Sequence, residues 1–201
     1  MYCYWRTWVK SDLLENLNTA LREQVRVSEG REAQPSACIM DSQSVKASEY
    51  AAERGFDGAK SINGRKRFIL TATLRLVLKV HITPANLKEP DGERDLLERL
   101  DGQFPRLNHL WVDQGFRFWE FSCWVLGALK WMTEITGKSV VRPSDKDFAV
   151  IPRHWVVERT FAWVTRCRRL SRDVERLSKT AESLIYACMT RLMLRRLASN
   201  A

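Results

Sequence analysis

The chain has 201 residues, of which 45% are apolar and 28% charged, and its formal net charge is +9. This length and apolar content are sufficient for one globular domain with a buried core, and they exclude an intrinsically disordered chain. No apolar run approaches ~18 residues, so no transmembrane helix is expected, and the excess of Lys and Arg favours a polyanionic partner such as nucleic acid.

The N-terminal part of the chain predicts one helix and a linker. Apolar residues recur at helical spacing over residues 11–27, with Ser11 as the N-cap. Residues 28–36 are polar and form the best candidate boundary. We therefore expect an N-terminal helical segment over residues 1–34 and a second unit over residues 35–201.

Strand-like runs follow the linker. The apolar residues 37–40 predict a short strand that ends at Asp41. Residues 47–64 contain three glycines and no clear period, which indicates a loop. Residues 67–74 and 76–82 predict two further strands.

The second half of the chain alternates between helix and strand. The predicted elements are a turn over 84–91, a helix over 92–100 capped by Asp91, a strand over 107–113, a helix over 117–129, a strand within 130–141, a helix that contains Glu158, and a helix over 179–197. Capping and first-turn positions explain the acids of the first of these helices, which are Glu89, Asp91, Glu93 and Asp95. This order of elements predicts a mixed sheet covered by helices, in the α/β class.

Five cysteines are scattered along the chain without any CxxC pair. This spacing argues against a disulfide framework or a zinc module, and it indicates a reducing cytoplasm.

Three acidic residues stand beside apolar runs, where acids are normally avoided. Asp41 follows the run 37–40, Asp113 follows 110–112, and Glu158 follows a Trp-Val-Val triplet in the predicted helix. A carboxylate in such a place is unfavourable unless a cation or hydrogen bonds compensate it. Two strand aspartates and a helical glutamate can hold a pair of divalent cations for phosphodiester chemistry. The alternative from the residues alone is a set of capped or surface-paired acids.

Five local segments occur in order along the chain and carry a family resemblance. They are Asp41-Ser-Gln-Ser-Val-Lys46, Gly64-Arg-Lys-Arg67, Thr83-Pro-Ala-Asn86, Leu110-Trp-Val-Asp-Gln-Gly-Phe116 and Arg153-His-Trp-Val-Val-Glu-Arg-Thr-Phe-Ala-Trp163. Over residues 35–198 the chain resembles the DDE-type transposases of bacterial insertion sequences, specifically the insertion sequence five family.

The resemblance implies a ribonuclease-H-like fold, a mixed sheet flanked by helices. Asp41 and Asp113 match the two catalytic aspartates of the family, and Glu158 matches its glutamate. It also implies two bound Mg²⁺ ions, for which Mn²⁺ can substitute, and DNA cleavage followed by strand transfer at the element ends. The expected partners are double-stranded DNA, as element ends and target, and a second copy of the chain in a homodimer on DNA. The expected location is the bacterial cytoplasm, at the nucleoid.

The chain departs from the family pattern at several positions. Thr165 stands seven residues after the glutamate, where a basic residue is usual, and Arg75 stands where a glycine is usual in a strand turn. Only residues 2–27 correspond to the longer N-terminal helical sequence that recognises the element ends in the family. We therefore expect a catalytic part with a shortened N-terminus, either half of a split reading frame or a decayed copy.

Basic residues near these motifs are candidates for DNA contact. Arg65, Lys66 and Arg67 precede a predicted strand and could follow the DNA backbone. Lys46 and Arg159 are close in sequence to the acids, so they could hold the scissile phosphate or neutralise the acids. Further candidates for a phosphate contact are Arg166, Arg168 and Arg169. The alternative for each basic cluster is a solvated surface.

Three functions remain open from the sequence. The first is a transposase catalytic domain that acts on the ends of its own element. The second is a metal-dependent DNA nuclease without end specificity, and the third is an inactive remnant that still binds DNA.

Overall fold

The computed structural model describes residues 2–100, 102–113, 118–135 and 154–199. The elements in chain order are α1 (Tyr2–Lys10), α2 (Leu13–Ser28), β1 (Ala37–Lys46), β2 (Gly55–Asp57), β3 (Ile62–Ala72), β4 (Val77–Pro84), α3 (Glu89–Glu98), β5 (His109–Val112), α4 (Phe118–Leu129), β6 (Met132–Ile135), α5 (His154–Arg166), the 3-10 helix η1 (Arg168–Leu170) and α6 (Ser178–Ser199).

The strands of the described residues form one mixed sheet of six strands. The order is β2-β3-β1-β5-β6, and β4 pairs with β3 beside β2. β1 runs antiparallel to β3 and parallel to β5, and β5 runs parallel to β6. β1 therefore lies at the centre of the sheet, where apolar strand residues are buried on both faces.

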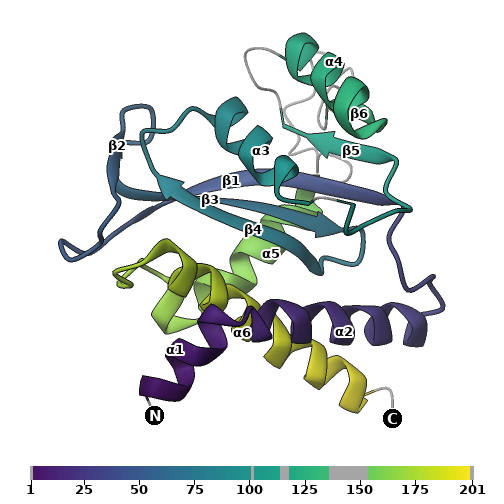
Figure 1. The fold of residues 1–201 in the computed structure, drawn as a ribbon, viewed down its shortest axis with the longest axis horizontal. Coiled ribbons are helices and arrows are strands. Elements are labelled where there is room, and N and C mark those ends of the chain that lie inside the picture. Colours follow the sequence, from purple (N-terminus) through teal and green to yellow (C-terminus); the bar gives the residue numbers. More distant parts are fainter. Residues whose placement is uncertain (1, 101, 114–117, 136–153, 200–201) are drawn as a thin grey trace, which may run out of the picture.

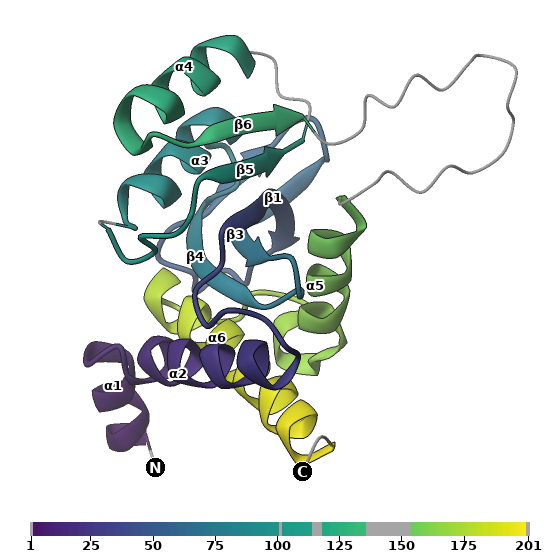
Figure 2. The same cartoon turned by 90° about the vertical axis from the view of Figure 1, so that its right-hand side faces the viewer.

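Helices cover both faces of this sheet (Figures 1 and 2). On one face, α3 and α4 pack on a core that includes Met40, Phe68 and Leu70. On the other face, α2, α5 and α6 pack on a core that includes Ile39 and Ile69. Because neighbouring residues of a strand point to opposite faces, β1 and β3 contribute alternate side chains to the two cores. The predicted α/β architecture, a mixed sheet flanked by helices, is confirmed.

The outer edge of β4 is covered by side chains from two helices. The backbone N–H of Val80 donates to the Tyr186 hydroxyl at 3.1 Å, and the N–H of Ile82 donates to Glu182 Oε1 at 2.9 Å, both from α6. The buried Arg22 of α2 donates from Nη1 to the Val77 carbonyl at 3.1 Å. An edge strand with free backbone groups invites unwanted pairing, and these contacts prevent it along β4.

The N-terminal helices belong to the same packed body as the sheet. Leu14, Leu21 and Val25 of α2 lie in the core that α5 and α6 share. The predicted helix over 11–27 corresponds to α2, whereas α1 was not predicted. None of the helices described is both long and apolar enough to cross a bilayer.

Three element predictions were wrong. β1 continues for five residues past Asp41, because it pairs with β3 as far as Lys46. The predicted loop over 47–64 contains β2 and the start of β3. The helix predicted from residue 92 begins at Glu89, and its N-cap is Lys88, which makes no side-chain capping bond.

Candidate active site

Asp41 lies on β1, and Asp113 directly follows the last residue of β5, the neighbouring parallel strand. Ile39 of β1 is paired with Trp111 of β5, and each aspartate comes two residues later in its own strand direction. Alternate residues of a strand share a face, so Asp41 lies on the face of Ile39, which α5 covers. Asp113 lies one residue beyond β5, and it would follow the same face as Trp111 if the strand geometry continued to it. Neighbouring strands are ~4.8 Å apart, which brings two carboxylates 72 residues apart in sequence close together.

A third acid, Glu93 of α3, lies near both aspartates, because their charges affect its pKa. The pKa of Glu93 is raised to about 8, first by burial and then by the negative charges of Glu89, Asp41 and Asp113, in that order of effect. Each of these three carboxyl groups therefore lies within electrostatic reach of Glu93. Ser42, next to Asp41, donates from Oγ to Glu89 Oε1 at 2.9 Å and so connects α3 to β1.

Glu93 is a residue that sequence reasoning missed. We interpreted Glu89 and Glu93 as helix-capping acids, because they stand near the start of a helix. The signal that could have found Glu93 is its spacing from Glu89, since residues four apart share one helix face. This helix face approaches the aspartates, since Asp41 and Asp113 both raise the pKa of Glu93. Helix capping alone would not account for that effect.

Glu158 comes from α5, the helix that lies across the face followed by the two aspartates (Figure 2). Val157 and Phe161 of this helix are buried in the core, whereas Glu158 is exposed. The helix alternates in this way because apolar residues at helical spacing turn inward and the charged residues between them turn outward.

Arg75 fixes α5 against the sheet. This residue lies in the turn between β3 and β4 with φ 65°, the left-handed region in which glycine is favoured. Its guanidinium carbon lies 5.2 Å from the ring centroid of Trp155 and 5.6 Å from that of Trp163, both on α5. The Thr160 hydroxyl also donates to the Arg75 carbonyl at 3.3 Å. Arg75 thus adopts an unfavourable backbone conformation, and its contacts with the two tryptophans hold the turn against the helix that contains Glu158.

The donor set is chemically suited to a hard cation, because it consists of carboxylate oxygens alone. Among the residues described, however, no group of three or more His, Cys, Asp or Glu side chains is close enough to hold a metal ion together. Asp41 lies on β1, Asp113 follows the end of the neighbouring strand β5, and Glu158 comes from α5. In the described structure these three acids do not form a three-ligand cluster.

The family model described as "Transposase DDE domain" matches residues 32–193, which is most of the chain. The chain belongs to this family. The catalytic core domain of BIV integrase is similar at 14% sequence identity and a TM-score of 0.48, over 82% of this chain and 97% of that one. No curated protein matches the chain.

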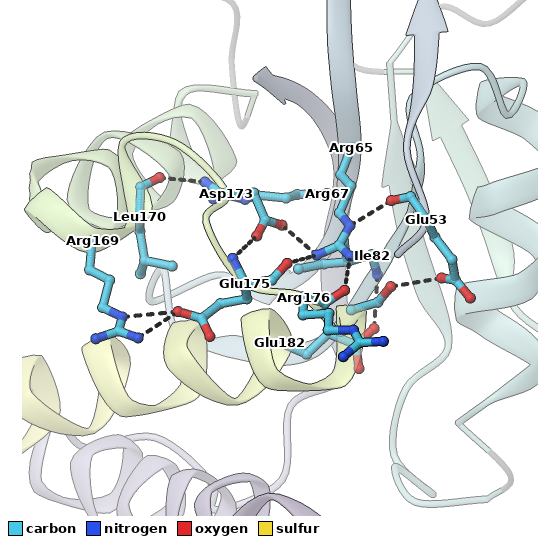
Figure 3. Close-up of polar contacts among 11 residues, drawn as sticks. Glu53, Arg65, Arg67, Ile82, Arg169, Leu170, Asp173, Glu175, Arg176 and Glu182 are labelled. Carbon is cyan, nitrogen blue, oxygen red and sulfur yellow. Dashed lines mark hydrogen bonds and ion pairs between the residues drawn. The ribbon is translucent and has the colours of Figure 1, made fainter. Parts of the chain in front are cut away.

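Three of the basic residues predicted to contact DNA are buried in this DDE transposase domain, and Figure 3 shows the polar contacts of two of them, Arg65 and Arg67. The exposed fraction is 0% for Arg65, 5% for Lys66 and 0% for Arg67. Arg65 Nη1 lies 3.3 Å from Asp173 Oδ2, with both side chains fully buried. Arg65 also donates to the carbonyls of Glu53, Glu175 and Arg176, at 2.8, 2.9 and 2.7 Å.

The other two residues of this group are held in the same way. Lys66 Nζ donates to the Leu87 carbonyl at 3.0 Å, and Arg67 Nη1 donates to the Leu170 carbonyl at 2.7 Å. Burial lowers the pKa of Arg67 from its ordinary value. The prediction of a DNA-facing strand start is corrected: residues 170–176 close over β3 and make Arg65 and Arg67 part of the interior.

Lys46 is exposed but distant from the acids. It lies five residues beyond Asp41 in the same strand, which corresponds to ~17 Å at 3.3–3.4 Å per residue, and an odd separation places it on the other face. Closeness in sequence to Asp41 therefore does not bring Lys46 to the candidate site.

The remaining basic candidates are exposed on α5 and the turn after it. Arg159 and Arg166 lie on α5, and Arg168 and Arg169 lie on η1. Arg169 makes an ion pair with Glu175 at 2.8 Å.

Proposed function

We propose that this member of the DDE transposase domain family is a DNA transposase that cleaves and rejoins phosphodiester bonds at the ends of an insertion sequence of the insertion sequence five type. The observation that carries the proposal is the placement of Asp41 on β1 and of Asp113 at the end of the neighbouring parallel strand β5, on a sheet whose face is covered by the helix that contains Glu158. Family membership supplies the reaction class.

Asp41, Asp113 and Glu158 are the residues that would hold the Mg²⁺ ions. When bound, two such ions stabilise charge on the attacking and leaving oxygens of a phosphodiester, and Mn²⁺ has similar oxygen preferences. The two aspartates supply oxygens from the sheet, and Glu158 supplies oxygens from the helix side. In the metal-free protein, burial and the acidic neighbours raise the pKa of Glu93 to about 8, so this side chain is mostly protonated at neutral pH.

The DNA partners follow from the same proposal. The substrate is double-stranded DNA, first as element ends and then as target. A homodimer would bring two ends together, with one set of acids acting on each. Residues 1–34 remain the candidate remnant of an end-binding region, and residues 35–201 the catalytic unit.

A second candidate is an inactive DNA-binding remnant of a transposase. It is favoured by one observation: the described acids do not form a cluster of three that is ready for a metal ion.

Nicking of supercoiled plasmid DNA separates the two candidates. Under the first proposal the wild-type protein nicks DNA in Mg²⁺ or Mn²⁺ but not in EDTA. Asp113→Asn abolishes nicking, and Glu98→Gln, which changes an exposed acid of α3, leaves it intact. Absence of nicking by the wild-type protein in both metals supports the inactive remnant. Equal nicking by wild type and Asp113→Asn removes Asp113 from the mechanism.

Competition between duplexes tests the substrate. If the enzyme is a transposase, duplexes that contain the inverted repeats flanking its coding region are cut in preference to scrambled duplexes of equal length. Equal cutting of both supports a nuclease without end specificity.

A further inference from the structure

A groove separates the C-terminal end of α5 from the C-terminal half of α6. Its volume is about 480 Å³. Half-buried side chains form its floor, namely Trp163, Cys188 and Leu192, and exposed arginines form its rim, namely Arg166, Arg191 and Arg195. We call this feature the α5–α6 groove.

The surroundings of the α5–α6 groove are one-sided in charge. Between Glu158 and Asp173 the chain contains five arginines and no acid, and after Glu182 it contains three arginines and no acid. None of the three rim arginines makes an ion pair with the described part of the chain. Their positive charges are therefore not neutralised by neighbouring carboxylates, and the groove attracts an anion.

A fourth arginine of the groove is fixed to the protein. Arg196 Nη1 lies 3.4 Å from Glu29 Oε1 and 3.3 Å from the Leu74 carbonyl, and its guanidinium stacks over Trp163 at 5.2 Å. This contact holds α6, α5 and the end of α2 together at one end of the groove. The groove is thus a fixed feature of the fold, whereas its rim arginines remain available to a ligand.

The rim spacing suits a run of phosphates. Arg191 and Arg195 are four residues apart on α6, so they lie on one face, separated by ~6 Å along the axis. Successive phosphates of one DNA strand advance by ~3.4 Å each along the duplex. Arginine also offers a planar fork of donors that matches the oxygens of a phosphate.

One face of α5 connects the α5–α6 groove, at Arg166, with the position of Glu158. Glu158, Ala162 and Arg166 are all exposed and four residues apart, so they form one stripe on the helix. Glu158 and Arg166 are eight residues apart, or ~12 Å at 1.5 Å per residue. That length corresponds to three or four base pairs of a duplex at ~3.4 Å per pair.

We propose that the α5–α6 groove binds the phosphate backbone of double-stranded DNA, a few base pairs from the phosphate that lies at Asp41, Asp113 and Glu158. The distance from the acids rests on the proposed function, but the binding of duplex backbone does not. Neutralisation of phosphates by the rim arginines releases counterions, so this part of the affinity depends on salt.

Fluorescence anisotropy with a labelled random-sequence duplex of about 30 base pairs tests the proposal, in EDTA and across about 50–200 mM KCl. The groove variant is Arg191→Gln/Arg195→Gln. The matched control is Arg54→Gln/Arg99→Gln, which removes the same charge from two exposed arginines that lie outside the groove. Each phosphate contact contributes ~0.9 to the slope of log affinity against log salt, so the groove variant should lose ~1.8 of that slope. We expect its affinity at about 50 mM KCl to fall about tenfold, and the control to keep the wild-type slope.

Two outcomes overturn the proposal. One is a slope and affinity for the groove variant that match those of the control, provided that circular dichroism shows all the proteins folded. The other is that the groove variant loses as much affinity for poly-glutamate as it loses for DNA. That result would make the groove a binding surface for acidic protein segments. Because the assay contains no metal, it is independent of cleavage. If the wild-type protein does not nick DNA but the groove variant still binds DNA more weakly, only the proposed function is refuted. If the wild-type protein nicks DNA but the groove variant binds DNA as tightly as the control, only the groove proposal is refuted.

Discussion

The buried ion pair between Arg65 and Asp173 makes the sharpest prediction about stability. Removal of one partner of a buried pair leaves an uncompensated charge and destabilises a protein by ~3–5 kcal/mol. In Asp173→Asn the guanidinium of Arg65 keeps three hydrogen bonds to backbone carbonyls, which still stabilise the cation. We therefore expect a loss at the lower end, about 3 kcal/mol, which corresponds to a fall of about 6–12 °C in Tm for a chain of this size.

Urea unfolding followed by circular dichroism measures this loss. The matched control is Glu32→Gln, because Arg106 Nη1 and Glu32 Oε2 are also 3.3 Å apart but their side chains are 47% and 77% exposed. Exposed pairs contribute roughly 0–1 kcal/mol, so the control should change the free energy of unfolding by no more than that. A loss in Asp173→Asn no greater than in Glu32→Gln would refute the reasoning that burial makes this pair important.

The reverse substitution sharpens the test. In Arg65→Met the Asp173 carboxylate still accepts a hydrogen bond from the backbone N–H of Glu175 at 3.0 Å, but it loses its cation. The substitution also leaves three carbonyls without their donor. It should therefore cost about 5 kcal/mol, more than Asp173→Asn. An equal or smaller loss would contradict the assignment of the carbonyl contacts to Arg65.

Three further predictions concern the core and the candidate site. Glu93 has a folded-state pKa of about 8, above its unfolded value of about 4.5, so the native state binds more protons than the unfolded state between these pH values. The free energy of unfolding should therefore fall as pH rises from about 4.5 to 8. Glu93→Gln should remove this fall, which urea midpoints at about pH 5 and about pH 8 measure. Tyr186→Phe deprives the Val80 N–H of its acceptor and should lower the free energy of unfolding by about 1–3 kcal/mol, whereas an unchanged urea midpoint would show that another acceptor replaces the hydroxyl. Gly64→Ala would place a Cβ 1.9 Å from a backbone carbonyl oxygen of β1 and should destabilise the protein by about 1–3 kcal/mol or more in urea unfolding. Gly58→Ala, whose Cβ would have no atom within 4 Å, should be tolerated in the same assay.

The position of α5 is what makes Glu158 a candidate for the third acid. The contact of Arg75 with two tryptophans fixes the helix to the turn between β3 and β4, far from the acids in sequence. The opposite face of the sheet contributes Glu93, whose high pKa limits the negative charge at the site. The chemistry proposed for the protein thus depends on helices from both layers.

Local patterns in the chain were sufficient to identify the fold class and the two aspartates. An acid directly after an apolar strand run is a signal contained within a few residues, and it led to both Asp41 and Asp113. The alternation of apolar and polar residues likewise predicted most strands and helices, because that periodicity follows from the backbone geometry of each element.

Long-range packing decided the roles of the other charged residues. Arg65 and Arg67 were predicted to contact DNA at the start of a strand. Residues 170–176, more than 100 positions later, instead supply carbonyls and a carboxylate that hold these two arginines in the interior. The sequence predicted Glu93 to be a helix-capping acid, whereas the fold brings α3 close enough for Asp41 and Asp113 to raise its pKa. The physical reason is the same in each case. The charge of a side chain is local information, whereas its desolvation and its partners depend on which distant segments the fold brings against it.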